Sequence, residues 1–215
     1  MNGWRALVRP GVSCAHGRLL SRREIVYRMG MPNLTRQWTV TDRDELPDDG
    51  NRYEVIDGEL FVTPAPAWKH QEAVAQLYRL IAGYLDLEPI GHAFMAPADI
   101  VFSPKRGVQP DLFVVPLVGG RTPRHFDDVR QLLLAVEVLS PSTARADRVA
   151  KRMLYRDEQV GQYWIVDLDS RIIERSTPSE TRPEILDSRL EWLPAGATRS
   201  LTIDLIDYFR QVLDT

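Results

Sequence analysis

Two acidic residues lie at positions where they could support metal-assisted chemistry. Asp111 opens the apolar run 112–115, and Glu137 lies near the end of the still more apolar run 132–139. An ionised carboxylate held away from water costs several kcal/mol or more unless a partner compensates it. Because the two runs are expected to be strands that could lie side by side, we expect one shared partner. The sequence therefore predicts a hard divalent cation such as Mg²⁺ at Asp111 and Glu137.

A row of polar residues on the next segment is predicted to reach the same place. Asp147, Lys151 and Tyr155 are each four residues apart, in a segment expected to be helical from about 144 to 159. At roughly 100° per residue this spacing keeps them near one line of the helix. The predicted apolar face beside that line is formed by Ala146, Val149, Ala150, Met153 and Leu154. Lys151 could then offset the charge of a phosphate or a hydroxide above Glu137, with Asp147 and Tyr155 in auxiliary roles.

Simpler interpretations of these residues stay open at this point. Asp111 follows a proline and could be a turn or cap residue, and Glu137 could pair with an arginine of the next helix. Asp147 and Lys151 could form a solvated i,i+4 ion pair, worth a few tenths of a kcal/mol.

Two residues nearer the N-terminus are candidates for auxiliary roles. Glu54 lies between Tyr53 and Val55 in an expected strand, so it could point to the far face, or it could be an auxiliary metal ligand. His70 lies one turn into an expected helix, which favours a capping or orienting role over that of a base.

The pattern along the chain predicts short strands with a few helices between them. Asp57-Gly58 between two β-rich runs predicts a type I′ hairpin over 52–63, because both turn residues must take positive φ. Apolar residues at helical spacing predict a helix over 67–87. The remaining expected strands are 38–41, 92–95, 99–102, 111–115, 132–139, 163–167 and 171–175, with a turn at 104–107 and helical segments at 42–46, 127–131 and 205–213.

Composition and charge are those of an ordinary soluble globular protein. The chain has 215 residues, 44% hydrophobic and 27% charged, which favours one domain. A net charge of −3 argues against nucleic-acid binding by bulk charge but leaves a local basic groove open. No apolar run approaches the roughly 18 residues that span a bilayer. The single cysteine, Cys14, allows no intrachain disulfide, so we expect a reducing, cytoplasmic location and no membrane partner.

The first thirty residues form a basic leader, with six arginines against the single acid Glu24. The apolar stretch Ala6-Leu7-Val8 is too short for the apolar region of a secretory signal, about 7 to 15 residues long. We expect residues 1–30 to be a disordered leader or a mis-assigned start. Met29 or Met31 would then begin the chain, and residues 31–215 would form a single domain.

A series of short motifs has the order and spacing seen in one known protein family. The motifs are Arg52-Tyr53-Glu54-Val55-Ile56-Asp57-Gly58-Glu59-Leu60, Thr63-Pro64-Ala65-Pro66, His70, Gln109-Pro110-Asp111, Val136-Glu137-Val138-Leu139-Ser140-Pro141-Ser142-Thr143, Asp147, Lys151, Tyr155 and Tyr163-Trp164-Ile165-Val166-Asp167. In these motifs the chain resembles the Uma-two family of restriction-endonuclease-like proteins, part of the PD-(D/E)xK nuclease superfamily. The resemblance runs from about Trp38 to the C-terminus.

The resemblance implies an α/β fold with a restriction-endonuclease-like core, in which helices flank a mixed β-sheet and an N-terminal β-hairpin precedes it. It also implies Mg²⁺-dependent hydrolysis of phosphodiester bonds, with Mn²⁺ as a substitute metal. Carried over residue by residue, the first acid of the motif falls on Asp111 and the second on Glu137. The motif lysine would fall on Leu139, which departs from the superfamily pattern. The resemblance places that lysine on the following helix, at Lys151.

Three classes of function follow from these residues. The first is a metal-dependent endonuclease that cuts nucleic acid, with DNA favoured, and a homodimer is compatible with it. The second is a catalytically inactive module of the same fold that binds nucleic acid or a protein partner, which Leu139 favours and the retained Asp111, Glu137 and Lys151 disfavour. The third is a metal-dependent hydrolase of another phosphoester.

Overall fold

The structure, a computed structural model, describes residues 36–129 and 131–214. The predicted leader, residues 1–30, lies outside the described residues. No helix in the described ranges is long and apolar enough to cross a membrane.

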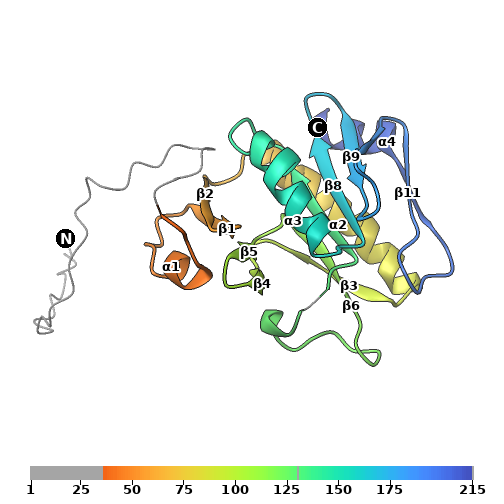
Figure 1. The fold of residues 1–215 in the computed structure, drawn as a ribbon. Coiled ribbons are helices and arrows are strands. Elements are labelled where there is room, and N and C mark those ends of the chain that lie inside the picture. Colours follow the sequence, from red (N-terminus) through yellow and green to blue (C-terminus); the bar gives the residue numbers. More distant parts are fainter. Residues whose placement is uncertain (1–35, 130, 215) are drawn as a thin grey trace, which may run out of the picture.

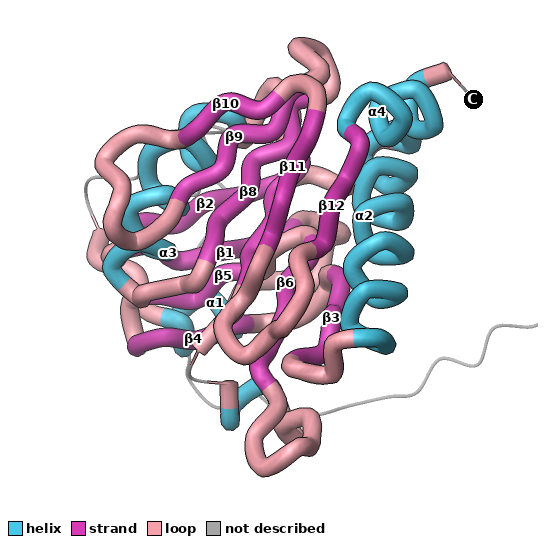
Figure 2. The backbone as a smooth tube through the Cα atoms, turned by 90° about the vertical axis from the view of Figure 1, so that its right-hand side faces the viewer, coloured by secondary structure: helices cyan, strands magenta, loops and turns pink. Residues whose placement is uncertain are grey.

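A six-stranded mixed sheet organises the molecule (Figures 1 and 2). Its strands, in spatial order, are β10 (Glu184–Leu186), β9 (Ile172–Ser176), β8 (Gln162–Asp167), β7 (Leu134–Val138), β6 (Leu112–Pro116) and β3 (Gly91–Met95). β7 and β8 are parallel, and the other neighbouring pairs are antiparallel. A parallel pair needs a crossover connection. The segment between β7 and β8 supplies it with a π-helix, η2 (Ala146–Lys151), and α3 (Arg152–Asp157).

A smaller sheet carries the N-terminal hairpin. Its spatial order is β2 (Glu59–Thr63), β1 (Arg52–Ile56), β5 (Arg106–Val108) and β4 (Ile100–Ser103). Asp57 and Gly58 both have positive φ, 52° and 84°, so the predicted type I′ hairpin is confirmed. A third sheet pairs β11 (Arg189–Trp192) with β12 (Leu201–Asp204), and α1 (Val40–Asp44) packs beside β1.

Helices cover both faces of the central sheet. α2 (Trp68–Leu87) and α4 (Leu205–Leu213) lie on one face, and α3 lies on the other (Figure 2). Strand alternation sends Leu134, Val136 and Val138 of β7 into the core under α2 and α4, and Ala135 into the core under α3. Side chains at odd positions of β7 therefore face α3 and the smaller sheet.

One local prediction near the N-terminus was wrong, and one turn was predicted too long. The expected strand over 38–41 is absent from the described structure, because Thr39 caps α1 through reciprocal hydrogen bonds with Asp42. The turn expected over 104–107 is shorter than predicted, and β5 begins at Arg106. Position 107 in that strand requires glycine. A Cβ atom added there would lie 2.7 Å from Val40 Cγ2, which is too close.

The predicted apolar face of the helix after β7 was right only in part, because Ala146 and Leu154 are buried and Ala150 packs against the core under α3, but two other members are exposed. Val149 and Met153 are 55% and 50% exposed, whereas Asp147, Lys151 and Tyr155 are buried. Part of the segment is a π-helix, so it does not follow the α-helical geometry that the prediction assumed. The polar row faces the sheet because, as described below, its side chains contact acids of the strands.

Candidate active site

Strand register brings the two predicted acids together. In the antiparallel β6–β7 pair Leu112 lies opposite Val136, so Asp111 and Glu137 occupy the next opposed positions. Their neighbours two residues away, Phe113 and Ala135, belong to the core under α3. Alternation therefore directs both carboxylates to that side of the sheet, where Asp111 is 4% exposed and Glu137 is 1% exposed.

The hairpin adds two more residues from the opposite wall. Arg52 and Glu54 of β1 alternate with Tyr53 and Val55, which belong to a separate small core. They share a face with Ile56, which packs in the core under α3. The interpretation that Glu54 points to the far face was wrong, because that side chain reaches the same site as Glu137.

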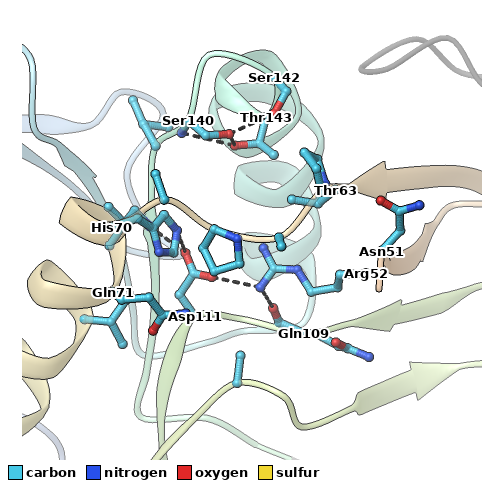
Figure 3. Close-up of a pocket in the computed structure, with 18 of the residues that line it drawn as sticks. Asn51, Arg52, Thr63, His70, Gln71, Gln109, Asp111, Ser140, Ser142 and Thr143 are labelled. Carbon is cyan, nitrogen blue, oxygen red and sulfur yellow. Dashed lines mark hydrogen bonds and ion pairs between the residues drawn. The ribbon is translucent and has the colours of Figure 1, made fainter. Parts of the chain in front are cut away.

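Asp111 is surrounded by hydrogen-bond donors (Figure 3). Arg52 Nη1 lies 2.8 Å from Asp111 Oδ1, and His70 Nε2 lies 3.0 Å from Oδ2. The Val138 backbone N–H also donates to Oδ2, at 2.9 Å. Burial opposes ionisation, but the hydrogen bond from His70 and the charge of Arg52 outweigh it and hold the pKa of Asp111 below its ordinary value. Asp111 is therefore ionised at neutral pH. His70 contacts it as an orienting residue would.

Glu137 has a different environment. Its Oε1 atom accepts hydrogen bonds from Lys151 Nζ at 2.9 Å and from the Tyr155 hydroxyl at 3.3 Å. Burial raises the pKa of Glu137 well above its ordinary value, Lys151 opposes that shift, and nearby Asp111 adds to it. Burial and Glu137 also raise the pKa of Tyr155, so its hydroxyl stays protonated and donates.

Lys151 joins three acids at the centre of the site. Its Nζ atom lies 2.8 Å from Glu54 Oε2, 2.9 Å from Glu137 Oε1 and 3.5 Å from Asp147 Oδ1. Burial favours neutral lysine, but these carboxylates outweigh it and raise the pKa of Lys151 above its ordinary value. With 2% of its side chain exposed, Lys151 is not part of a solvated i,i+4 pair, and that alternative is wrong.

We call Glu54, Asp111, Glu137 and Asp147 the acid cluster. A cavity of about 1100 Å³ opens on its Asp111 side, and Asp111, Arg52 and His70 line its wall (Figure 3). A second cavity of about 10 Å³, roughly the space of one water molecule, is lined by Glu54, Asp147 and Lys151. The site thus has an open side at Asp111 and a closed side at Lys151.

The acid cluster fits a hard divalent cation in chemistry and in charge. Its donors are carboxylate oxygens, and among the described residues its four acids contact Arg52 and Lys151, together with the His70 imidazole. Asp147 Oδ1 is buried and accepts no hydrogen bond from the described residues. The present arrangement is not preformed for a metal, since no group of three or more His, Cys, Asp or Glu within the described ranges is placed to hold one.

Two residues of the site were missed by the sequence interpretation. Arg52 joins Asp111 to the Gln109 carbonyl, to which its Nη1 donates at 3.0 Å. The Gln109 backbone N–H in turn donates to Glu54 Oε1 at 2.8 Å. A signal for Arg52 existed, because Arg52 and Glu54 are two apart in one strand and must share a face. For Gln109 the contact is made by its backbone, which no side-chain pattern reveals.

Comparisons with known proteins agree with this architecture. The family model Uma2, described as "Putative restriction endonuclease", matches residues 40–205. A similar solved structure is a "putative nuclease belonging to DUF820 from Anabaena variabilis", with a TM-score of 0.68, 20% sequence identity, and coverage of 81% of this chain and 99% of that one. This likeness confirms the predicted nuclease-like fold. No curated protein matches the chain.

Proposed function

Because the chain belongs to the Uma2 restriction endonuclease family, we propose that it is a metal-dependent endonuclease that hydrolyses phosphodiester bonds in DNA. Family membership supports nuclease activity in general. One observation supports the specific proposal most directly: Asp111 and Glu137 converge from adjacent strands, Asp111 lines a large cavity, and the Lys151 ammonium lies behind it against Glu137. Phosphoryl chemistry asks the protein chiefly for such positioned charge.

In this proposal Asp111 and Glu137 hold the metal, Mg²⁺ with Mn²⁺ as a substitute. When bound, the ion lowers the pKa of a coordinated water and takes charge from the phosphate. Asp111 suits this role because Arg52 and His70 keep it ionised at the cavity wall. Glu137 needs to lose the proton that burial favours, so metal binding should release protons.

The other residues of the site hold charge in place. Lys151 carries a raised pKa and stays protonated, so it stabilises negative charge and is not a general base. Glu54 and Asp147 position its ammonium from opposite sides of the site, one from β1 and one from η2. His70 orients Asp111, and Tyr155 donates to Glu137. In this proposal the nucleophile that attacks the phosphorus is therefore water, and not one of these side chains.

A substrate and metal panel tests the proposal. Purified protein is incubated with plasmid, single-stranded DNA and RNA, in Mg²⁺, in Mn²⁺ and in EDTA. We expect cleavage of DNA with either metal and none in EDTA. The Glu137→Gln protein should be inactive, whereas the matched Glu184→Gln protein, changed at an exposed strand position, should keep parental activity. DNA cleavage that persists in EDTA or in the Glu137→Gln protein would refute the metal mechanism.

A further inference from the structure

Building on the proposed function, we infer that the large cavity takes an unpaired stretch of a DNA strand and not a base-paired duplex. The cavity, about 1100 Å³, is bounded by the loop before β1, the turn after β2, the start of α2, the loop after β3 and the segment 138–144 (Figure 3). Three properties of its lining point to this substrate: the depth of the reactive groups, the apolar walls and the balance of charge.

The reactive groups lie too deep for a stacked duplex. Asp111, Glu137 and Lys151 are each 4% exposed or less. In a duplex the backbone follows the outside of a rigid stack, so a phosphate reaches a recessed group only if its nucleotide leaves that stack. Such extrusion costs a few kcal/mol for a paired base and least for a base that is already unpaired. A strand without a partner could therefore enter at the lowest cost.

The walls of the cavity suit the faces of unstacked bases. They include apolar side chains from several separate segments: Leu46, Pro64, Pro66, Met95, Pro97 and Pro141. A duplex hides its base faces by stacking and presents phosphates, sugars and base edges, which polar and basic groups recognise. An unpaired nucleotide exposes a flat apolar face that packs against such walls. The lining thus matches the part of DNA that only an unpaired strand offers.

The charge of the lining is unfavourable for a duplex. Its basic side chains are Arg43, Arg52, Lys69 and Arg148, and its acids are Asp44, Asp48, Asp99, Asp111, Asp167 and Asp169. Three of these four basic side chains already form ion pairs with acids of the lining: Arg43 with Asp99, Arg52 with Asp111, and Arg148 with Asp167. Duplex binding depends on neutralising many phosphates with lysine and arginine. A short unpaired segment brings fewer phosphates into an acidic cavity.

Cleavage of matched oligonucleotides tests this inference. One sequence is prepared as a single strand, as a full duplex, and as a duplex with a central stretch of unpaired nucleotides. With Mg²⁺ or Mn²⁺ we expect the single strand to be cut about 10 to 100 times faster than the full duplex, the rate equivalent of the unstacking cost. The third substrate should be cut within its unpaired stretch. Equal or faster cleavage of the full duplex overturns the inference and leaves the proposed function intact. Failure to cut any of the three overturns the proposed function itself.

A wall variant adds an independent test. Met95 lies opposite Leu112 in the β3–β6 pair, next to Asp111, and is 42% exposed. Met95→Ala removes apolar wall without emptying the core, so KM for the single strand should rise about three- to tenfold while kcat changes little. Met153→Ala is the matched control, at 50% exposure and outside this cavity. If the two variants keep the same KM and the same melting temperature, Met95 does not contact the substrate, and the apolar-wall argument is wrong.

Discussion

Asp111 and Glu137 occupy opposed positions on adjacent strands, yet their surroundings shift their pKa values in opposite directions. Asp111 lines the large cavity and accepts hydrogen bonds from Arg52, His70 and a backbone N–H, so it is ionised. Glu137 lies behind it against Lys151 and Tyr155, where burial raises its pKa. The comparison shows that the acid at the open end of the cluster has a lowered pKa, while the acid at the closed end has a raised one.

The four carboxyl groups of the acid cluster are thus not equally easy to ionise. Arg52 and Lys151 carry two positive charges against four acids, and burial raises the pKa of two of these acids, Glu137 and Asp147. Divergent pKa values in a pair of close acids are a recurrent property of catalytic sites. Four changes would break or sharpen this contrast, and they are given from the largest expected effect to the smallest.

Removal of Lys151 should have the largest effect. Lys151→Met leaves three buried carboxylates without their shared cation, and we expect a loss of about 3 to 5 kcal/mol in the free energy of unfolding. Cleavage should fall about 10² to 10³-fold in single-turnover assays. Lys105→Met, which changes an exposed lysine, is the control and should cost less than about 0.5 kcal/mol. If the Lys151→Met protein cuts at the parental rate with its metal site filled, Lys151 is not catalytic.

Metal binding should stabilise the fold and release protons, and we expect both effects to depend on Glu137. Mg²⁺ at about one hundred times its dissociation constant should stabilise the parent by about 2.7 kcal/mol. Binding should also release protons, because burial raises the pKa of Glu137 and a metal ligand must be ionised. Calorimetry in buffers of different ionisation enthalpy measures that release. Glu137→Gln should remove both the stabilisation and the proton release, and retention of either in that variant would exclude Glu137 as a ligand.

Removal of Arg52 should cost less than removal of Lys151. In the Arg52→Met protein Asp111 keeps His70 and the Val138 N–H, so we expect a loss of about 1 to 3 kcal/mol. Denaturant unfolding of both variants under the same conditions gives the comparison. If Arg52→Met is the more destabilising change, the Asp111 end, and not the Glu137 end, carries the larger burden of buried charge.

The pH dependence of stability should have opposite signs at the two ends. The pKa of Asp111 is lowered, so its stabilisation is present above its ordinary value of 3.8 and is lost as pH falls below it. The pKa of Glu137 is raised, so the folded protein keeps a proton that the unfolded chain loses, and stability falls as pH rises above 4.5. Each slope is at most about 1.4 kcal/mol per pH unit.

Unfolding in EDTA across the pH range measures both slopes. Asp111→Asn should flatten the acid limb of the curve, and Glu137→Gln should flatten the decline above pH 4.5. Equal effects of the two amide substitutions on both limbs would mean that the two acids share one environment, contrary to the structure.

The sequence predicted the strands that carry the acids because the relevant signals are local. Apolar runs marked β6 and β7, Asp57-Gly58 marked the hairpin, and four-residue spacing connected Asp147 with Lys151 and Tyr155. The interactions that distinguish Asp111 from Glu137 are not local. Arg52 lies 59 residues before Asp111, and α1 packs so closely over β5 that no side chain would fit at Gly107. Neither the Arg52–Asp111 contact nor the packing of α1 on β5 can be recognised from a short segment of sequence.

The π-helix also makes the site sensitive to chain length. In η2 the backbone hydrogen bonds span five residues, so this turn accommodates more residues than an α-helical turn does. Val149 lies within it and is exposed, so its side chain could be changed at little cost to packing. Deletion of Val149 should have a larger effect than substitution of its side chain. Loss of one residue would shorten the wide turn that connects Asp147 to Lys151 and would change the angle between these two side chains. A single-codon deletion at a tolerant surface position would therefore disturb a buried site.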